Sequence, residues 1–187
     1  MGQIEQARGK DSKLQALRRP PILAKIIGTG FGSGYFPLCP GTAGSALALL
    51  IWILMGEVIP LPYKEAFPIA LEAFTIALIL IFTVLGTWAT AKLMPFWGDD
   101  PKRVTIDEMA GQWISLLAAP AFVYENRIWM ALAALILFRF FDIVKPLGIR
   151  TLDRKTGAFW VMADDLLAGI YSMIILIIIG NIPGWVI

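Results

Sequence analysis

Residues 66–91 read AFPIALEAFTIALILIFTVLGTWATA and contain one charged side chain, Glu72. A helix needs about 20 mostly apolar residues to cross the hydrocarbon core of a bilayer. This stretch is long enough to do so, and it therefore predicts a transmembrane helix.

Four further apolar runs occupy residues 43–60, 109–124, 128–141 and 166–182. The first and last are long enough to span, whereas the middle two are shorter. The polar break Glu125-Asn126-Arg127 between the middle runs predicts a tight hairpin. We therefore expect an all-α, polytopic membrane helix bundle of about five transmembrane helices, preceded by a Gly-rich segment at 28–34 that is re-entrant or interfacial.

The composition of the whole chain also indicates a membrane environment. Of the 187 residues, 58% are hydrophobic and 16% are charged, against about 45–50% and roughly 25% in an average soluble domain. This composition excludes disorder, collagen-like repeats and an ordinary soluble enzyme. The formal net charge of +2 gives no reason to expect a nucleic-acid partner.

Two residue types that supply many active sites are scarce. The chain has no histidine, which excludes histidine nucleophiles, Ser-His-Asp triads and His-ligated metals. Cys39 is the only cysteine, so neither an intramolecular disulfide nor a cysteine-based zinc site can form. The tyrosine-phosphatase pattern of Cys and a later Arg fails, because Ser45 stands at the Arg position. Carboxylates, lysines, arginines, hydroxyl groups and backbone amides remain for catalysis.

The distribution of Lys and Arg predicts the orientation of the spans. With a cytoplasmic N-terminus and five alternating spans, only Lys64 and Arg127 of the 16 Lys and Arg residues fall outside. This asymmetry agrees with the positive-inside rule. We expect residues 1–21 to form a basic cytoplasmic tail and residues 22–187 to form a single membrane-embedded domain.

Under this topology, acidic residues from distant segments meet at the cytoplasmic membrane face. They are Asp107, Glu108, Asp142, Asp153, Asp164 and Asp165. Ionisable groups at the membrane are costly, which makes them candidates for function. Carboxylates flanked by Lys and Arg suit metal-assisted phosphoryl transfer, because Mg²⁺ binds hard oxygen ligands and the cations hold phosphate.

Structural explanations for the same residues remain open. Acids that begin a helix complement its macrodipole, which would account for the pairs 107–108 and 164–165 without catalysis. Arg139, Asp142 and Lys145 are spaced three apart and could form a row of ion pairs along one helix.

Several motifs follow one another along the chain. They are GTGFGSG at 28–34, PGT at 40–42, IDE at 106–108, GQW at 111–113, FRFFDIVKP at 138–146, IRTLDR at 149–154 and DDLLAG at 164–169. This ordered set closely resembles the phosphatidylglycerophosphatase A family over roughly residues 25–172. The resemblance implies a bacterial inner-membrane enzyme that uses Mg²⁺ to remove the terminal phosphate of phosphatidylglycerophosphate.

The resemblance also implies site residues by position. The metal and catalytic residues would be Asp107, Glu108, Asp142, Asp164 and Asp165, and the substrate contacts would be Thr29, Ser33, Thr42, Arg139, Lys145, Arg150 and Asp153. Residues 155–158 read KTGA where many members have His-Gly-Gly, and we infer that this histidine is dispensable. Asp100 is expected to lie outside the site.

Two other functions would require features of their own in the sequence. Another Mg²⁺-dependent lipid headgroup enzyme, a CDP-alcohol phosphatidyltransferase, would need the spacing D-x-x-D-G followed by G-x-x-x-D, which neither Asp107-Glu108 nor Asp164-Asp165 has. A small multi-spanning transporter would place charges in broken helices at the bilayer midplane. Here the charges lie towards one face, apart from Glu72.

The predicted orientation can be checked by labelling single cysteines in a Cys39→Ser background. In intact cells, Tyr63→Cys should react with a membrane-impermeant maleimide, whereas Lys155→Cys should react only after the membrane is opened. The reason is that the basic segments stay in the cytoplasm. Labelling of position 155 from outside would contradict the orientation.

Overall fold

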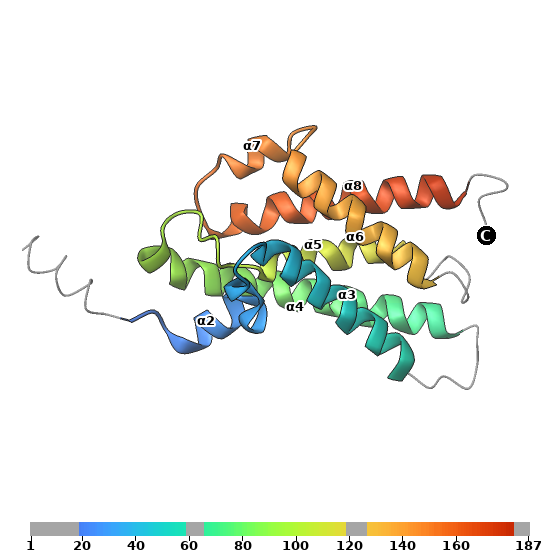
Figure 1. Ribbon diagram of the computed structural model, residues 1–187, viewed down its shortest axis with the longest axis horizontal. Coiled ribbons are helices and arrows are strands. Elements are labelled where there is room, and N and C mark those ends of the chain that lie inside the picture. Colours follow the sequence, from blue (N-terminus) through green and yellow to red (C-terminus); the bar gives the residue numbers. More distant parts are fainter. Residues whose placement is uncertain (1–18, 59–65, 119–126, 182–187) are drawn as a thin grey trace, which may run out of the picture.

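The computed structural model describes residues 19–58, 66–118 and 127–181, and within these ranges all regular structure is helical. The elements are α2 (Ile22–Gly28), the 3₁₀ helix η1 (Gly30–Tyr35), α3 (Pro40–Val58), α4 (Ala66–Trp97), α5 (Ile106–Leu116), α6 (Arg127–Val144), α7 (Ile149–Asp153) and α8 (Ala158–Gly180). Figure 1 shows the longer helices side by side in one bundle. The all-α prediction is confirmed for these ranges. Residues 1–18 of the expected tail and residues 119–126 of the expected hairpin lie outside them.

Three helices are long and apolar enough to cross a membrane, and they support three of the five expected spans. The segments are Pro40–Glu57 in α3, Ile69–Trp97 in α4 and Ala158–Gly180 in α8. The expected third span contains α5, whose 11 residues extend only about 16 Å, roughly half of the hydrocarbon core. The other two spans stay a prediction.

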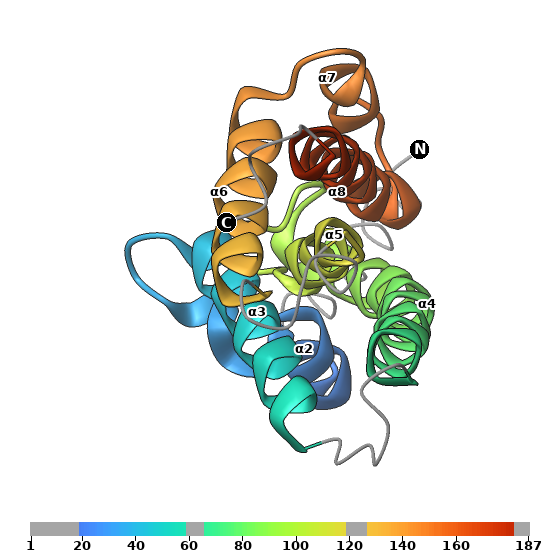
Figure 2. The same ribbon diagram turned by 90° about the vertical axis from the view of Figure 1, so that its right-hand side faces the viewer.

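The short helix α5 lies at the centre of the bundle. Figure 2 shows α3, α4, α6 and α8 around it, and α5 contacts all four. Every residue of α5 except Glu108 is buried. This helix therefore packs against protein on all sides, and the helices around it are the ones that can face lipid. The outer face of α4 fits this division, because Ile69 and Val84 are 70% and 68% exposed.

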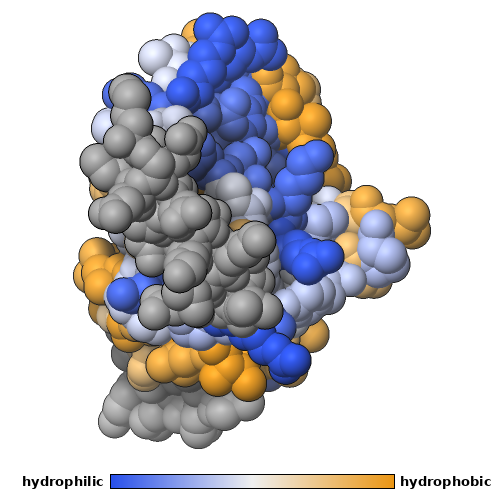
Figure 3. Space-filling model, turned by 90° about the vertical axis from the view of Figure 1, so that its left-hand side faces the viewer, coloured by the Kyte–Doolittle hydropathy of each residue, from blue (hydrophilic) through white to orange (hydrophobic). Residues whose placement is uncertain are grey.

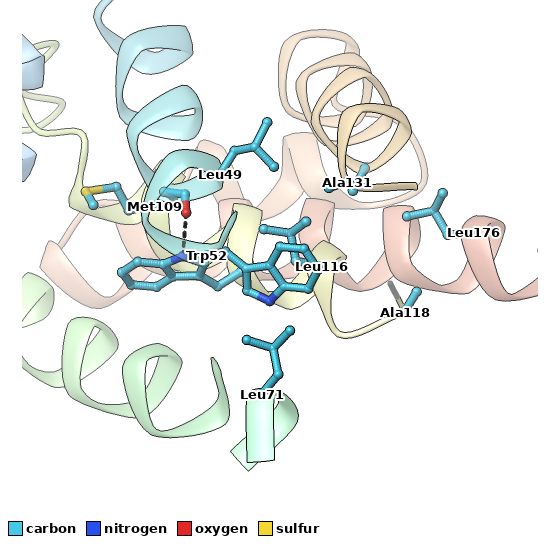
Figure 4. Packing of buried hydrophobic residues seen from close by; sticks show 11 residues of the cluster. Leu49, Trp52, Leu71, Met109, Leu116, Ala118, Ala131 and Leu176 are labelled. Carbon is cyan, nitrogen blue, oxygen red and sulfur yellow. Dashed lines mark hydrogen bonds between the residues drawn. The ribbon is translucent and has the colours of Figure 1, made fainter. Parts of the chain in front are cut away.

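Two buried tryptophans form hydrogen bonds between helices, Trp113 from α5 to α3 and Trp52 from α3 to α4. The indole N–H of Trp113 donates to the carbonyl oxygen of Ala48 at 2.9 Å, the bond dashed in Figure 4. The indole N–H of Trp52 donates to Thr75 Oγ1 at 3.1 Å. A buried N–H without a partner costs free energy, so both bonds let large aromatic side chains fill the core without that penalty.

The backbones of α5 and α8 touch directly where two glycines face each other. A Cβ atom on Gly169 would collide with the carbonyl oxygen of Gly111, and one on Gly111 would lie 2.5 Å from the carbonyl oxygen of Asp165. Helices approach this closely only where side chains are absent. The crossing brings the first turn of α5 beside the second turn of α8, and the acidic residues of both helices lie there.

The Gly-rich segment packs beneath the start of α5. The Thr105 N–H donates to the Gly28 carbonyl at 2.9 Å, and Ser33 Oγ lies 2.9 Å from Thr105 Oγ1. A Cβ on Gly34 would collide with the carbonyl oxygen of Arg103. These contacts fix residues 103–105, the last residues before α5, and the segment thereby supports the central helix.

Filling the glycine contact should loosen the bundle. Gly169→Ala should lower the free energy of unfolding by about 1–3 kcal/mol, because the new methyl group meets a backbone carbonyl that cannot turn aside. Gly86→Ala is the matched control, since its Cβ would meet the flexible end of Met162. Thermal unfolding in detergent should rank Gly169→Ala well below Gly86→Ala. Equal stabilities would contradict the close crossing.

Candidate active site

A pocket of about 410 Å³ lies at the end of the bundle where α3, α5 and α8 begin and α6 ends. Figure 3 looks at this end and shows hydrophilic side chains gathered around a hollow. Eight acidic side chains line the pocket: Asp99, Asp100, Asp107, Glu108, Asp142, Asp153, Asp164 and Asp165. Five basic side chains line it with them: Lys102, Arg139, Lys145, Arg154 and Lys155.

Three of these acids form a compact cluster. One carboxylate oxygen each from Asp107, Glu108 and Asp165 lie within 4.8 Å of one another. Asp107 and Asp165 are buried and Glu108 is half-buried. The first two residues come from the start of α5 and the third from α8, so the glycine crossing assembles the cluster.

The cluster has the chemistry of a cation site. Glu108 Oε2 and Asp165 Oδ1 are buried and have no hydrogen-bond partner among the described residues. Within the same ranges, no Lys or Arg forms an ion pair with any of the three acids. Buried carboxylates without counter-charge are strongly unfavourable, and Mg²⁺ prefers hard oxygen donors of this type. The residues present fit a divalent cation.

Burial acts on the titration of the two acids that begin α5. It raises the pKa of Asp107, and it raises the pKa of Glu108 well above the ordinary value. The adjacent Asp107 carboxylate adds to the shift at Glu108, because two nearby negative charges repel. Without a cation, these groups therefore hold protons at a pH where ordinary carboxylic acids are ionised.

The helix-dipole explanation accounts for only part of the cluster. Asp107 Oδ1 accepts a hydrogen bond from the Glu108 N–H at 3.0 Å, as expected for an acid that begins a helix. However, α8 begins at Ala158, so Asp164 and Asp165 lie beyond its first turn. The dipole effect falls off within that turn, and it does not explain this second pair.

The other two predicted metal ligands are paired with cations. Asp142 Oδ2 lies 2.7 Å from Arg139 Nη1, one turn away on α6. Asp164 Oδ2 accepts a hydrogen bond from Lys145 Nζ at 2.7 Å. The geometry thus separates the five acids into a cluster of three and two ion-paired residues.

Lys145 connects three helices. It follows the last residue of α6, and its ammonium contacts both Asp153 at the end of α7 and Asp164 on α8. Although burial disfavours the charged form, the hydrogen bonds that the Lys145 ammonium donates to the two carboxylates raise the pKa of Lys145 above the ordinary value. Lys145 therefore stays a cation at the pocket wall, and it does not extend a row along α6.

Four residues expected to contact substrate do not line the pocket: Thr29, Ser33, Thr42 and Arg150. Thr29 Oγ1 donates to the carbonyl oxygen of Lys25 at 2.7 Å. The Ser33 hydroxyl group forms a hydrogen bond with the hydroxyl group of Thr105, directly before α5. Thr42 is half-buried in α3, and Arg150 is exposed. Hydroxyl groups satisfied by nearby backbone are not free to bind a ligand.

Several pocket residues were missed from the sequence. Asp99, Asp100 and Lys102 come from the loop between α4 and α5. Arg154 and Lys155 come from the segment that leads into α8, and Trp160 lies in the first turn of α8. Asp100, which was expected to lie outside the site, lines this pocket. The signal was the charge density of GDDPKR at 98–103 and DRK at 153–155, beside the motifs already noted.

A helical membrane protein with a buried carboxylate cluster and cationic side chains in one pocket has the components for metal-assisted chemistry on phosphate esters. The family model described as phosphatidylglycerophosphatase A matches residues 26–180. The chain belongs to the phosphatidylglycerophosphatase A family, which is a family of phosphatases.

Individual relatives carry two different names. A Bacteroides thetaiotaomicron protein named "Putative phosphatidylinositol-3-phosphatase" is 47% identical over 91% of this chain and 99% of its own length. The Escherichia coli phosphatidylglycerophosphatase A is 36% identical over 83% of each chain. The Haemophilus influenzae phosphatidylglycerophosphatase A is 34% identical over 80% of this chain and 84% of its own length. No solved structure matches the chain.

A cation in the carboxylate cluster should stabilise the fold in a pH-dependent manner. With raised carboxyl pKa values, the metal-free folded state binds more protons than the unfolded state, so its stability falls as pH rises above the ordinary carboxyl range. Metal binding needs deprotonated ligands. Mg²⁺ should therefore raise the melting temperature in neutral detergent more at pH 8 than at pH 5.

A matched pair of variants tests whether the cluster is responsible. Glu108→Gln should lose most of the Mg²⁺ response. Glu57→Gln should keep it, because Glu57 is exposed at the far end of α3 and does not line the pocket. A full response in Glu108→Gln would contradict the assignment.

Proposed function

We propose that this protein hydrolyses phosphatidylglycerophosphate to phosphatidylglycerol and phosphate, and that the reaction depends on Mg²⁺. The observation that carries the proposal is the cluster of Asp107, Glu108 and Asp165, none of which forms an ion pair with a Lys or Arg within the described ranges. Family membership and the names of the E. coli and H. influenzae relatives support the choice of substrate.

Different pocket residues have different roles in the proposed hydrolysis. Asp107, Glu108 and Asp165 would hold Mg²⁺, which supplies Lewis-acid polarisation of the phosphoryl group and an activated water when it is bound. Arg139 and Lys145 bind the oxygens of the terminal phosphate. Water attack forms one P–O bond while the ester P–O bond breaks, and phosphatidylglycerol leaves with its hydroxyl group restored.

The ion pairs prepare the two cations for this task. Asp142 holds Arg139, and Asp153 and Asp164 hold Lys145. A phosphate that approaches these cations meets side chains already aligned by their carboxylate partners, so less ordering is needed when the substrate binds. A carboxylate of the pocket accepts the proton that the attacking water gives up.

The proposal includes an arrangement in the membrane. We propose five spans, with the pocket at the cytoplasmic face of the bacterial inner membrane, the acyl chains between helices in the inner leaflet and residues 1–21 as a cytoplasmic tail. The pocket lining includes residues from the 99–102 and 153–156 segments. Both segments belong to the basic, cytoplasmic side of the positive-inside assignment.

A second candidate substrate is a phosphatidylinositol phosphate. The observation in its favour is the name of the Bacteroides relative, which shares 47% identity with this chain. Both lipids carry a phosphate monoester on a headgroup alcohol, so the same hydrolysis applies. A transporter function is a different class, and it predicts no release of phosphate.

Phosphate release from mixed micelles tests the proposal directly. Purified protein should release phosphate from phosphatidylglycerophosphate with Mg²⁺ and should release almost none in excess chelator. Glu108→Gln should lower turnover by about a hundredfold or more, because it removes a charge that the cation needs. Glu57→Gln is the matched control and should keep wild-type turnover.

The outcomes separate the candidates. A higher kcat/KM for phosphatidylinositol 3-phosphate than for phosphatidylglycerophosphate would select the second substrate. Full turnover in chelator would reject the metal. No turnover of either lipid by the folded protein would reject the enzyme assignment.

A further inference from the structure

The five cations of the pocket are not equivalent. Arg139 and Lys145 are partly buried and paired with carboxylates. Lys102, Arg154 and Lys155 line the same pocket but are exposed, and no described carboxylate lies within 4.0 Å of their charged groups. We call these three residues the rim cations. Their charge is available to an anion that enters the pocket.

We call the acid cluster with Arg139 and Lys145 the inner site. Contacts with neighbouring residues position two of the rim cations in the same pocket. Lys155 Nζ lies 3.7 Å from the ring centroid of Trp160, which also lines the pocket. A cation–π contact positions an ammonium without neutralising it. Backbone bonds from Arg154 N to Arg150 O and from Lys155 N to Leu152 O fix this segment to α7.

The same segment links the rim to the inner site. Asp153, the residue before Arg154, contacts Lys145, which also contacts Asp164 on α8 in the same pocket. The pocket lining therefore differs in exposure: the cluster acids and the paired cations are buried or half-buried, and the rim cations are exposed. A ligand that fits this lining carries one anionic group beside Arg139 and Lys145 and another beside the exposed rim cations.

We propose that the rim cations bind the phosphodiester of the lipid substrate while its terminal phosphate monoester lies at the inner site. This inference rests on the proposed function and deepens it. The substrate class is a lipid whose headgroup carries a monoester and is joined to diacylglycerol by a diester. Phosphatidylglycerophosphate and phosphatidylinositol 3-phosphate share this chemistry, and phosphatidic acid, with a monoester alone, lacks it. The rim cations thereby select for two phosphates in one headgroup.

A matched pair of double variants tests the rim in micelles of neutral detergent. Arg154→Gln/Lys155→Gln removes two rim charges. Lys92→Gln/Arg103→Gln removes one exposed Lys and one exposed Arg that do not line the pocket. Both variants change the net charge equally, so a general loss of attraction to anionic lipid affects both.

The kinetic constants should change in the rim variant alone. Its KM for phosphatidylglycerophosphate and for phosphatidylinositol 3-phosphate should rise about tenfold, the effect of losing roughly 1.4 kcal/mol of charge-assisted binding. Its kcat should stay near wild type, because the inner site is intact. The KM for phosphatidic acid should not change, and if that lipid is not turned over, its inhibition constant takes the place of KM. The conservative exchange Arg154→Lys/Lys155→Arg should restore most of the affinity.

Equilibrium binding separates this inference from the proposed function. Phosphatidylglycerol, which has the diester alone, should bind the rim variant about tenfold more weakly than it binds wild type or the control variant. Equal affinities, or an equal loss for phosphatidic acid, would overturn the rim assignment. A protein that binds phosphatidylglycerol through the rim but hydrolyses neither lipid would overturn the proposed function and leave the rim assignment standing.

Discussion

The direct contact between the backbones of α5 and α8 is the constraint on which the rest of the structure depends. Gly111 and Gly169 face each other with no room for a side chain. This approach places the first turn of α5 against the second turn of α8, and it brings Asp165 beside Asp107 and Glu108. A wider crossing would move Asp165 away from Asp107 and Glu108 and would break up the cluster. The close packing of small residues and the position of the candidate cation site are therefore one feature of the molecule.

The charged side chains of the pocket lie around that crossing. Within the described ranges, Asp107, Glu108 and Asp165 form no ion pair, and the carboxylate-paired Arg139 and Lys145 line the same pocket. Charges inside a protein are tolerated when they are paired or when they bind an ion. The pocket has ion-paired charges and, beside them, three acids whose arrangement fits a cation. Lys145 has a further role, because its contacts with α7 and α8 hold the segment 153–156 at the pocket wall.

The Gly-rich segment shows how a motif can serve the site without lining it. Its glycines and hydroxyl groups suggest a phosphate-binding turn when they are considered alone. In the structure, Thr29 and Ser33 bond to nearby backbone and to Thr105, directly before α5. The segment supports the helix that carries Asp107 and Glu108. Short polar side chains at glycine-rich turns commonly satisfy local backbone groups, and sequence does not distinguish that use from ligand binding.

The sequence by itself indicated that this protein lies in a membrane, and it showed which side chains are available for catalysis. The length of the apolar runs identified the helices α3, α4 and α8 as long enough to span, because that property depends on consecutive residues alone. The ordered motifs identified the family, and they predicted six of the eight pocket acids as site residues, five of them as metal ligands. Only the tertiary structure decided how those residues are used. It made α5 a short central helix, set Asp107, Glu108 and Asp165 apart from the ion-paired acids, and brought Asp100 and Lys155 to the pocket. The physical reason is that ion pairing and cation binding depend on distances of a few ångströms between separate helices, and packing sets those distances.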